Sequence, residues 1–300
     1  RLIAHKLPLW LCTIGFVLLT TLPTFEGHIP NGELFVMGFV MVGMWILSSR
    51  NYLASLLNYK DNQPLFTPSK KQQYLIVLAG VFLGFGFLTK VPSLLDTASV
   101  MFAAWLAWIS VVLTQSIRQH KLKLSVISLL SHWLPLVVGF LLPVIFSVIY
   151  FVLVGSGNDY LRFGLLYNLH YTQTWSHDFG SSLLNFLFTL PGKTTLLALL
   201  MIVLSVIKKI PTSIRWSAGW YILSFFAVLL SNRPYPHYWI QAVPALVLLI
   251  GLIFDQLLQD RSINNIKNWG SLMLIGGLIA LTVQVMTLLN FAPYSTTQYY

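Results

Sequence analysis

Charged residues are scarce in this chain. Only 9% of its 300 residues are Asp, Glu, Lys or Arg, and just eight of them are acids. Soluble domains average about 25% charged residues, so this chain has too few to cover a water-facing surface. Since 56% of the residues are hydrophobic, the composition excludes a soluble domain with a large core and predicts a polytopic membrane protein.

Cysteine is nearly absent as well. The single cysteine, Cys12, lies in an apolar run, so no internal disulfide can form and the redox compartment stays undetermined. The net charge of +10 does not indicate a nucleic-acid partner. The basic residues fall in short clusters between apolar runs, whereas nucleic-acid binding proteins gather them on one face.

Long apolar runs are what the chain has in abundance. A membrane-spanning helix needs about 20 mostly apolar residues, because its backbone must satisfy its own hydrogen bonds in hydrocarbon. The sequence predicts an all-α, polytopic transmembrane bundle forming one domain over residues 1–300. About nine spans are expected, at 7–25, 33–49, 74–89, 94–113, 133–153, 194–207, 216–230, 238–257 and 269–289. A short interfacial helix at 181–190 is expected before the sixth span, because Pro191 interrupts the run.

The basic residues predict the orientation of these spans. If the loops alternate between sides, 14 of the 18 Lys and Arg residues fall on one side, which the positive-inside rule makes cytoplasmic. The N-terminus is then cytoplasmic and the C-terminus extracytoplasmic. Five of the eight acids sort to the outer side, and ionisable groups at the membrane edge are functional candidates by default.

The first outer loop, "TFEGHIPNG", holds Glu26 and His28 and leads to Glu33 at the start of the next span. An acid at a helix N-terminus complements the macrodipole, and Asn31 is placed to act as the N-cap. Capping alone accounts for Asn31 and Glu33. It does not account for Glu26 and His28, so all three ionisable residues are kept as catalytic candidates.

A lone lysine, Lys90, ends the span "LAGVFLGFGFLTK" on the outer side, against the positive-inside bias. Either it snorkels to the interface, or it holds an anionic headgroup or phosphate. The small residues Gly80, Gly84 and Gly86 in this span predict close packing against another helix.

The two later outer loops mix aromatic and polar residues. The longer one, Gly155 to Ser182, suits a carbohydrate or acceptor surface, although an aromatic belt at the headgroups has the same composition. Its His and Asp residues are compatible with a divalent metal, but their spacing matches no specific site. The shorter loop, "SNRPYPHYWIQAVPAL", carries an arginine suited to bidentate phosphate binding and a histidine able to shuttle a proton. The residues singled out are Asp159, Arg162, His170, Tyr171, His177 and Asp178 in the first of these loops and Arg233, His237 and Tyr238 in the second.

Four stretches together resemble the GT-C superfamily of integral-membrane glycosyltransferases. The nearest subgroup is the dolichyl-phosphate-mannose–protein mannosyltransferases and the lipid A aminoarabinose transferases, with their bacterial relatives. The stretches are "PNGELFVMGFVMVGMWIL", "LAGVFLGFGFLTKVPSLL", "YNLHY" and, most specifically, "NRPYPHYWIQAVPALVLLI".

The resemblance implies a reaction and a location. A sugar would pass from a polyprenyl-phosphate donor to a lipid, glycan or protein acceptor on the outer side of a bacterial plasma membrane. A carboxylate would deprotonate or orient the acceptor, while basic residues would stabilise the departing lipid phosphate. Glu33 then becomes an active-site carboxylate, and Lys90, Arg233 and His237 bind the donor phosphate. No protein partner is implied.

One departure from the family bears on activity. Its principal catalytic acid usually lies in a large first outer loop after the first span, and this sequence has no such loop. Its first span looks like the family's third. The resemblance therefore implies a fragment that has lost two spans and the loop between them, and a 300-residue chain that is inactive alone.

Two other functions stay open from the sequence. A transporter or flippase of a lipid-linked glycan would show paired repeats and interrupted helices near the bilayer midplane. No repeat is evident, but Pro135 and Pro143 could interrupt the fifth span. An O-antigen ligase-like or polymerase-like enzyme would share the outer site and the lipid-phosphate donor, and would differ mainly in the acceptor.

Overall fold

A computed structural model of the chain describes residues 2–22, 26–27, 29–58, 66–114, 119–167, 178–207, 209–230, 233, 235–259 and 266–289. Throughout these ranges the ordered elements are helices, and no strand is found among them. This confirms the all-α fold class.

Six helical segments in the described ranges are long and apolar enough to cross a membrane, so the chain is a membrane protein. The prediction of nine spans is not confirmed, because α1 (Lys6–Thr21) and α10 (Leu190–Val206) are shorter and α11 (Thr212–Leu229) is not among the six. The six segments are α2 (Gly32–Ser48) continued by η2 (Ser49–Asn51) and α3 (Tyr52–Leu57), α4 (Lys70–Thr89), η3 (Val91–Ser93) with α5 (Leu94–Thr114), the greater part of α6 (Gln119–Leu153), η5 (Pro236–Ala242) with α12 (Val243–Gln259), and most of α13 (Ile266–Leu288).

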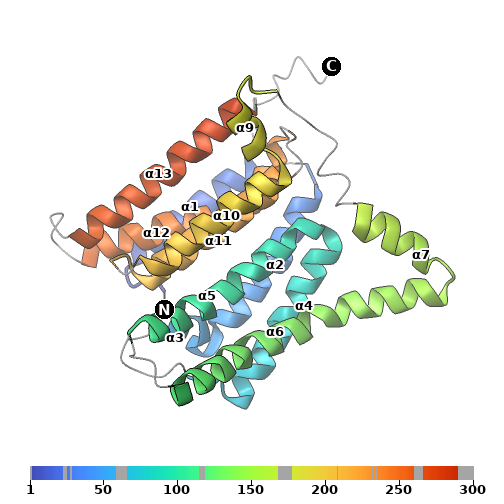
Figure 1. The fold of residues 1–300 in the computed structure, drawn as a ribbon, viewed down its shortest axis with the longest axis horizontal. Helices are drawn as coiled ribbons and strands as arrows, with labels where there is room; N and C mark the ends of the chain where they lie inside the picture. Colours follow the sequence, from blue (N-terminus) through green and yellow to red (C-terminus); the bar gives the residue numbers. More distant parts are fainter. Residues whose placement is uncertain are drawn as a thin grey trace.

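The helices form two groups that meet along α5 and α11 (Figure 1). In one group α4 packs against α2 and α6, and in the other α12 packs against α1, α11 and α13. Helix α11 lies in the centre of the molecule and is buried along most of its length, with Trp216 and Tyr221 at most 2% exposed. The core therefore runs through the contact between the two groups.

Glycines bring α4 and α6 into backbone contact. A Cβ added at Gly80 would lie 2.4 Å from the Leu136 carbonyl oxygen, and one at Gly84 would lie 2.4 Å from the Phe140 carbonyl oxygen. The predicted close packing is confirmed at these two positions. Gly86 instead faces Ser93 at ordinary van der Waals distance.

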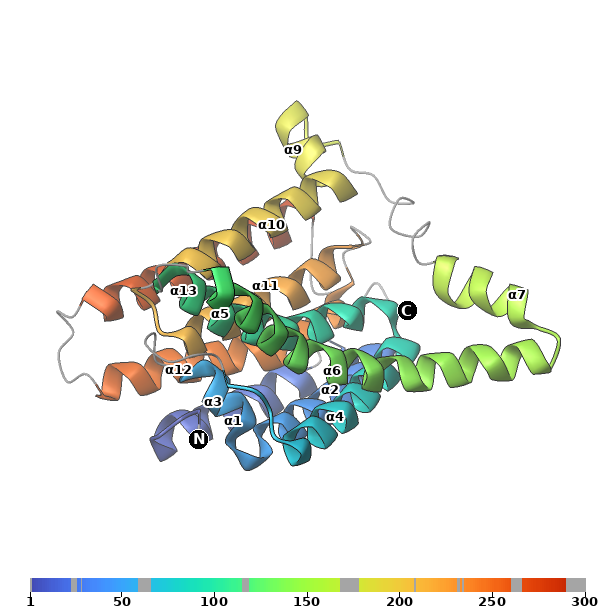
Figure 2. The same ribbon diagram turned by 60° about the horizontal axis from the view of Figure 1, so that its bottom comes forward.

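Helix α6 continues without interruption through Pro135 and Pro143. The interrupted helix that a transporter would show is therefore not found at this span. Beyond its contact with α4, α6 extends away from the bundle to a hairpin formed with α7 (Gly157–Asp159) and η4 (Tyr160–Leu166) (Figure 2).

The predicted N-cap of α2 is confirmed. The Asn31 side chain accepts a hydrogen bond from the Leu34 backbone N–H at 3.2 Å, which is the N-cap geometry expected for α2. A short helix, α9 (Ser182–Leu187), precedes α10 as expected, but α10 begins at Leu190 and not at 194, and Pro191 lies in its first turn, which Thr189 caps. Proline suits this position because the first helical N–H has no intrahelical partner.

Candidate functional site

The site is built around an ion pair between Lys90 and Glu33. Lys90 is the residue that ends α4, and Glu33 lies in the first turn of α2, directly after the Asn31 cap. The Lys90 Nζ donates a hydrogen bond to Glu33 Oε1. The Glu33 side chain is only 3% exposed and that of Lys90 is 27% exposed. Lys90 therefore neutralises a buried carboxylate while part of its own side chain stays accessible.

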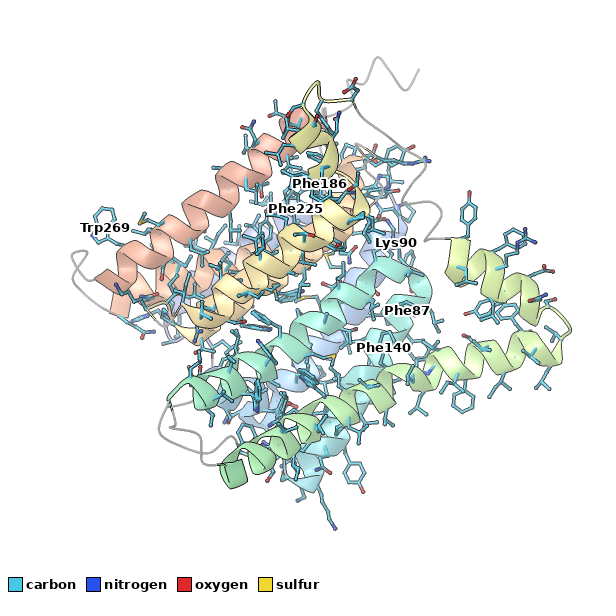
Figure 3. All side chains as sticks on the ribbon, in the orientation of Figure 1. Phe87, Lys90, Phe140, Phe186, Phe225 and Trp269 are labelled. Carbon is cyan, nitrogen blue, oxygen red and sulfur yellow. The ribbon has the colours of Figure 1, made fainter. Side chains whose placement is uncertain are left out.

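Tyr238 places an aromatic face beside the same lysine. The Lys90 Nζ lies 3.8 Å from the Tyr238 ring centroid, which is within cation–π distance. Tyr238 belongs to η5, so the lysine at the end of α4 connects α2 with η5. In Figure 3, Lys90 lies where the two helix groups meet at one end of the bundle.

A second acid–base pair lies next to the first. The His237 ring makes an edge contact with Tyr238 at 4.9 Å between centroids, and its Nδ1 lies 2.5 Å from Glu26 Oε2. The carboxylate thus orients the imidazole. The described part of the chain offers no hydrogen-bond partner to the other ring nitrogen, Nε2. That atom is available to donate a proton to a ligand or to accept one.

The turn that carries Glu26 has an unusual backbone. Glu26 has φ of +54°, in the left-handed region that non-glycine residues rarely adopt. The next residue, Gly27, packs so closely against the end of α1 that a Cβ there would lie 2.0 Å from the Thr20 carbonyl oxygen. Contact with α1 thus holds the turn in the conformation that directs the Glu26 carboxylate to His237.

Electrostatics at Lys90 reflect two opposing effects. Burial lowers the pKa of Lys90 below its ordinary value, whereas the charge and hydrogen bond of Glu33 raise it. An anionic group that reached the exposed part of the lysine would favour its charged form in the same way as Glu33 does. Glu33 therefore favours the charged form of Lys90 against the effect of burial.

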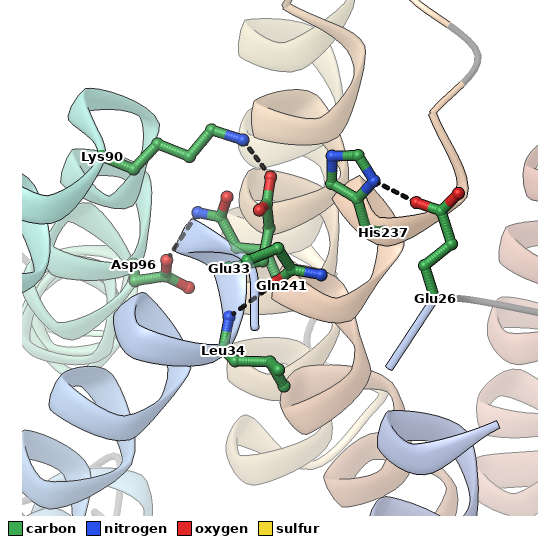
Figure 4. A network of polar contacts seen from close by, with 8 residues as sticks. Glu26, Glu33, Leu34, Lys90, Asp96, His237 and Gln241 are labelled. Carbon is green, nitrogen blue, oxygen red and sulfur yellow. Dashed lines mark hydrogen bonds and ion pairs between the residues drawn. The ribbon is translucent and has the colours of Figure 1, made fainter. Parts of the chain in front are cut away.

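Asp96, one of the five acids assigned to the outer side, and Gln241 extend this network. Asp96, near the start of α5, accepts a hydrogen bond at 2.9 Å from Gln241 Nε2 of η5. In Figure 4, Asp96 lies on one side of Glu33 and His237 with Glu26 lies on the other, while the Gln241 side chain reaches past Glu33 to Asp96. No local sequence signal distinguishes Asp96 from an ordinary acid in a first helical turn, and Gln241 has none either.

Other candidates lie beyond the Lys90–Glu33 and His237–Glu26 pairs. Arg233 is half-buried three residues before η5. Asp159 and Arg162 are exposed on the α7–η4 hairpin, which projects away from the bundle. His28, His170, Tyr171 and His177 lie outside the described residues. No group of three metal-ligating side chains occurs in the ranges that the structure covers.

No protein-family model, no curated protein and no solved structure matches this chain.

Proposed function

We propose that the protein is a membrane glycosyltransferase. It transfers a sugar from a polyprenyl-phosphate donor to an acceptor hydroxyl or amine on the extracytoplasmic side. The observation that carries the proposal is the placement of a partly exposed Lys90 against Tyr238 and beside His237, at an end of an apolar bundle. A cation at the membrane edge, next to an aromatic ring and an oriented imidazole, suits the phosphate of a lipid whose chain lies in the bilayer.

The residues divide the work of the reaction as follows. The acceptor heteroatom forms a bond to the anomeric carbon while the bond from that carbon to the phosphate oxygen breaks, and the electron pair leaves with the polyprenyl phosphate. Lys90 stabilises the negative charge that develops on this leaving group. The acceptor proton passes to a base, for which the His237–Glu26 pair has a suitable geometry.

Glu33 acts on Lys90 in this scheme. Its carboxylate accepts one hydrogen bond from the Lys90 ammonium. The ammonium has three N–H donors, so a phosphate arriving from the bilayer uses the donors that Glu33 leaves. Glu33 is then an active-site carboxylate that keeps the lysine charged and oriented.

Binding of a polyprenyl monophosphate to the purified chain in nanodiscs tests the proposal. Lys90→Met should raise the Kd by about 10-fold or more, as expected for the loss of one charge-assisted hydrogen bond. Lys70→Met is the matched control, since Lys70 is an exposed lysine at the opposite end of the same helix. Equal Kd values for the two variants would overturn the phosphate site, as would equal binding of the uncharged polyprenol.

A further inference from the structure

Asp96 differs from the other buried acids in the described part of the chain. Glu26, Glu33 and Asp255 each contact a basic side chain, namely His237, Lys90 and His5. Asp96 is 1% exposed and has no such partner among the residues described. A buried carboxylate without a cation is costly unless its oxygens are hydrogen-bonded. Hydrogen bonds from neutral partners are therefore needed to offset the cost of burying Asp96.

Three neutral donors from two other helices reach this carboxylate. Oδ1 accepts hydrogen bonds from Trp220 Nε1 at 2.8 Å and from Ser224 Oγ at 2.9 Å, both on α11. Oδ2 accepts the bond from Gln241 Nε2 at 2.9 Å, on η5. One carboxylate thus joins α5, α11 and η5.

The bond to Gln241 is one of two attachments between the same pair of segments. Gln241 follows Tyr238 by three residues, and side chains three apart lie on the same side of a 3-10 helix. Tyr238 contacts Lys90 and Gln241 contacts Asp96, so the segment from 90 to 96 contacts η5 at two points. His237 is the second residue of η5 and directly precedes Tyr238, so these two attachments also place its side chain.

We propose that Asp96 is a positioning residue that, through Gln241, fixes η5 and so places His237 and Tyr238 at the candidate site. Its role is geometric: it does not contact the ligand or transfer a proton to or from it. The positioning of η5 is inferred from the hydrogen bonds alone. The effect of Asp96 on ligand binding rests on the proposed function.

Conservative and disruptive substitutions separate a geometric role from a chemical one. In Asp96→Asn the oxygen still accepts from Trp220 and Ser224, and the new NH₂ donates to Gln241 once that amide turns over. All three contacts survive, so D96N should behave like the wild type. Asp96→Ala removes all three, and Gln241→Leu removes only the bond to η5.

Hydrogen exchange of the η5 amides measures positioning without any assumption about function. D96A and Q241L should exchange about 10-fold faster than wild type over residues 238–242, as expected for the loss of a hydrogen bond to a charged group. D255A is the matched control. Asp255 is equally buried, but it accepts bonds from the Ala4 and His5 backbone at the start of α1. D255A should accelerate exchange there and leave η5 unchanged.

Binding of the polyprenyl monophosphate supplies the functional readout. D96A and Q241L should raise the Kd about 10-fold at an unchanged number of sites, whereas a merely unfolded fraction lowers the number of sites and leaves Kd unchanged. Unchanged η5 exchange in D96A and Q241L would overturn the positioning role, and loss of binding in D96N would assign Asp96 a chemical one. If wild type does not bind the lipid but the exchange pattern holds, the proposed function fails and the positioning of η5 stands.

Discussion

Removing Lys90 should destabilise the protein more than removing Glu33 does, because Glu33 is the more deeply buried member of the ion pair. Lys90→Met leaves the Glu33 carboxylate, with its 3% exposed side chain, without a cation. Breaking a buried pair in this way costs about 3–5 kcal/mol. The first turn of α2 returns about 0.3–1 kcal/mol through the helix dipole, so we expect a net loss of about 3 kcal/mol.

Removing the acid should cost less. In Glu33→Gln the lysine keeps the Tyr238 ring, and its 27% exposed side chain still reaches solvent. A cation–π contact contributes about 0.5–2 kcal/mol, so E33Q should lose only about 1 kcal/mol. The double variant leaves neither charge buried and should be more stable than K90M alone.

Unfolding of the purified protein by SDS titration in mixed micelles measures these differences. The expected order of stability is wild type, E33Q, the double variant and then K90M. Equal losses for E33Q and K90M that add in the double variant would refute the reasoning, because they would show that the two charges do not compensate each other. Lipid-phosphate binding gives a second check: E33Q should bind at least as tightly as wild type, since the lysine is no longer neutralised.

Three further substitutions follow from the packing. Gly27→Ala meets the Thr20 carbonyl oxygen and should displace the turn carrying Glu26, raising the Kd for polyprenyl monophosphate several-fold, whereas Gly32→Ala meets nothing within 4 Å and should bind normally. Gly139→Ala meets the Val77 carbonyl oxygen at 2.0 Å and should lower the unfolding temperature by forcing α4 and α6 apart, at a cost of about 1–3 kcal/mol, whereas Gly276→Ala, in open space, should not. Arg162→Ala, on the projecting hairpin, should leave the Kd unchanged; a large increase would bring that hairpin into the site.

Local features of the fold are the ones that the sequence predicts well. The cap of α2, the break before α10 and the small residues that permit close packing of α4 each depend on residues within one or two helical turns. Spans are harder to count, because a buried helix such as α11 needs an apolar surface whether its neighbours are lipids or other helices. Apolar runs therefore predict helices more reliably than they predict membrane crossings.

The sequence predicts which residues lie at the candidate site, but it does not predict which acid pairs with which base. Sorting the charges by loop places Glu33, Lys90 and His237 on one side, and the structure brings them together at one end of the bundle. Which acid pairs with which base depends on tertiary packing between residues 57 positions apart for Glu33 and Lys90, and 211 apart for Glu26 and His237. Proximity in sequence makes Glu26 a neighbour of Glu33, whereas the fold gives each acid its own base.

Asp96 shows why the rest of the network has no sequence signature. An acid in the first turn of a helix is favoured by the macrodipole alone, so its presence at the start of α5 needs no further explanation. Its three donors follow 124, 128 and 145 positions later in the sequence. Two lie in an expected apolar span, and the third lies near the start of the next span. A tryptophan, a serine and a glutamine in such places are compatible with lipid-interface and helix-packing roles. Only when α5, α11 and η5 meet does each of them acquire the same acceptor. The buried carboxylate then becomes the feature that the surrounding sequence must satisfy, and η5, with its histidine and tyrosine, is held by the last of those bonds.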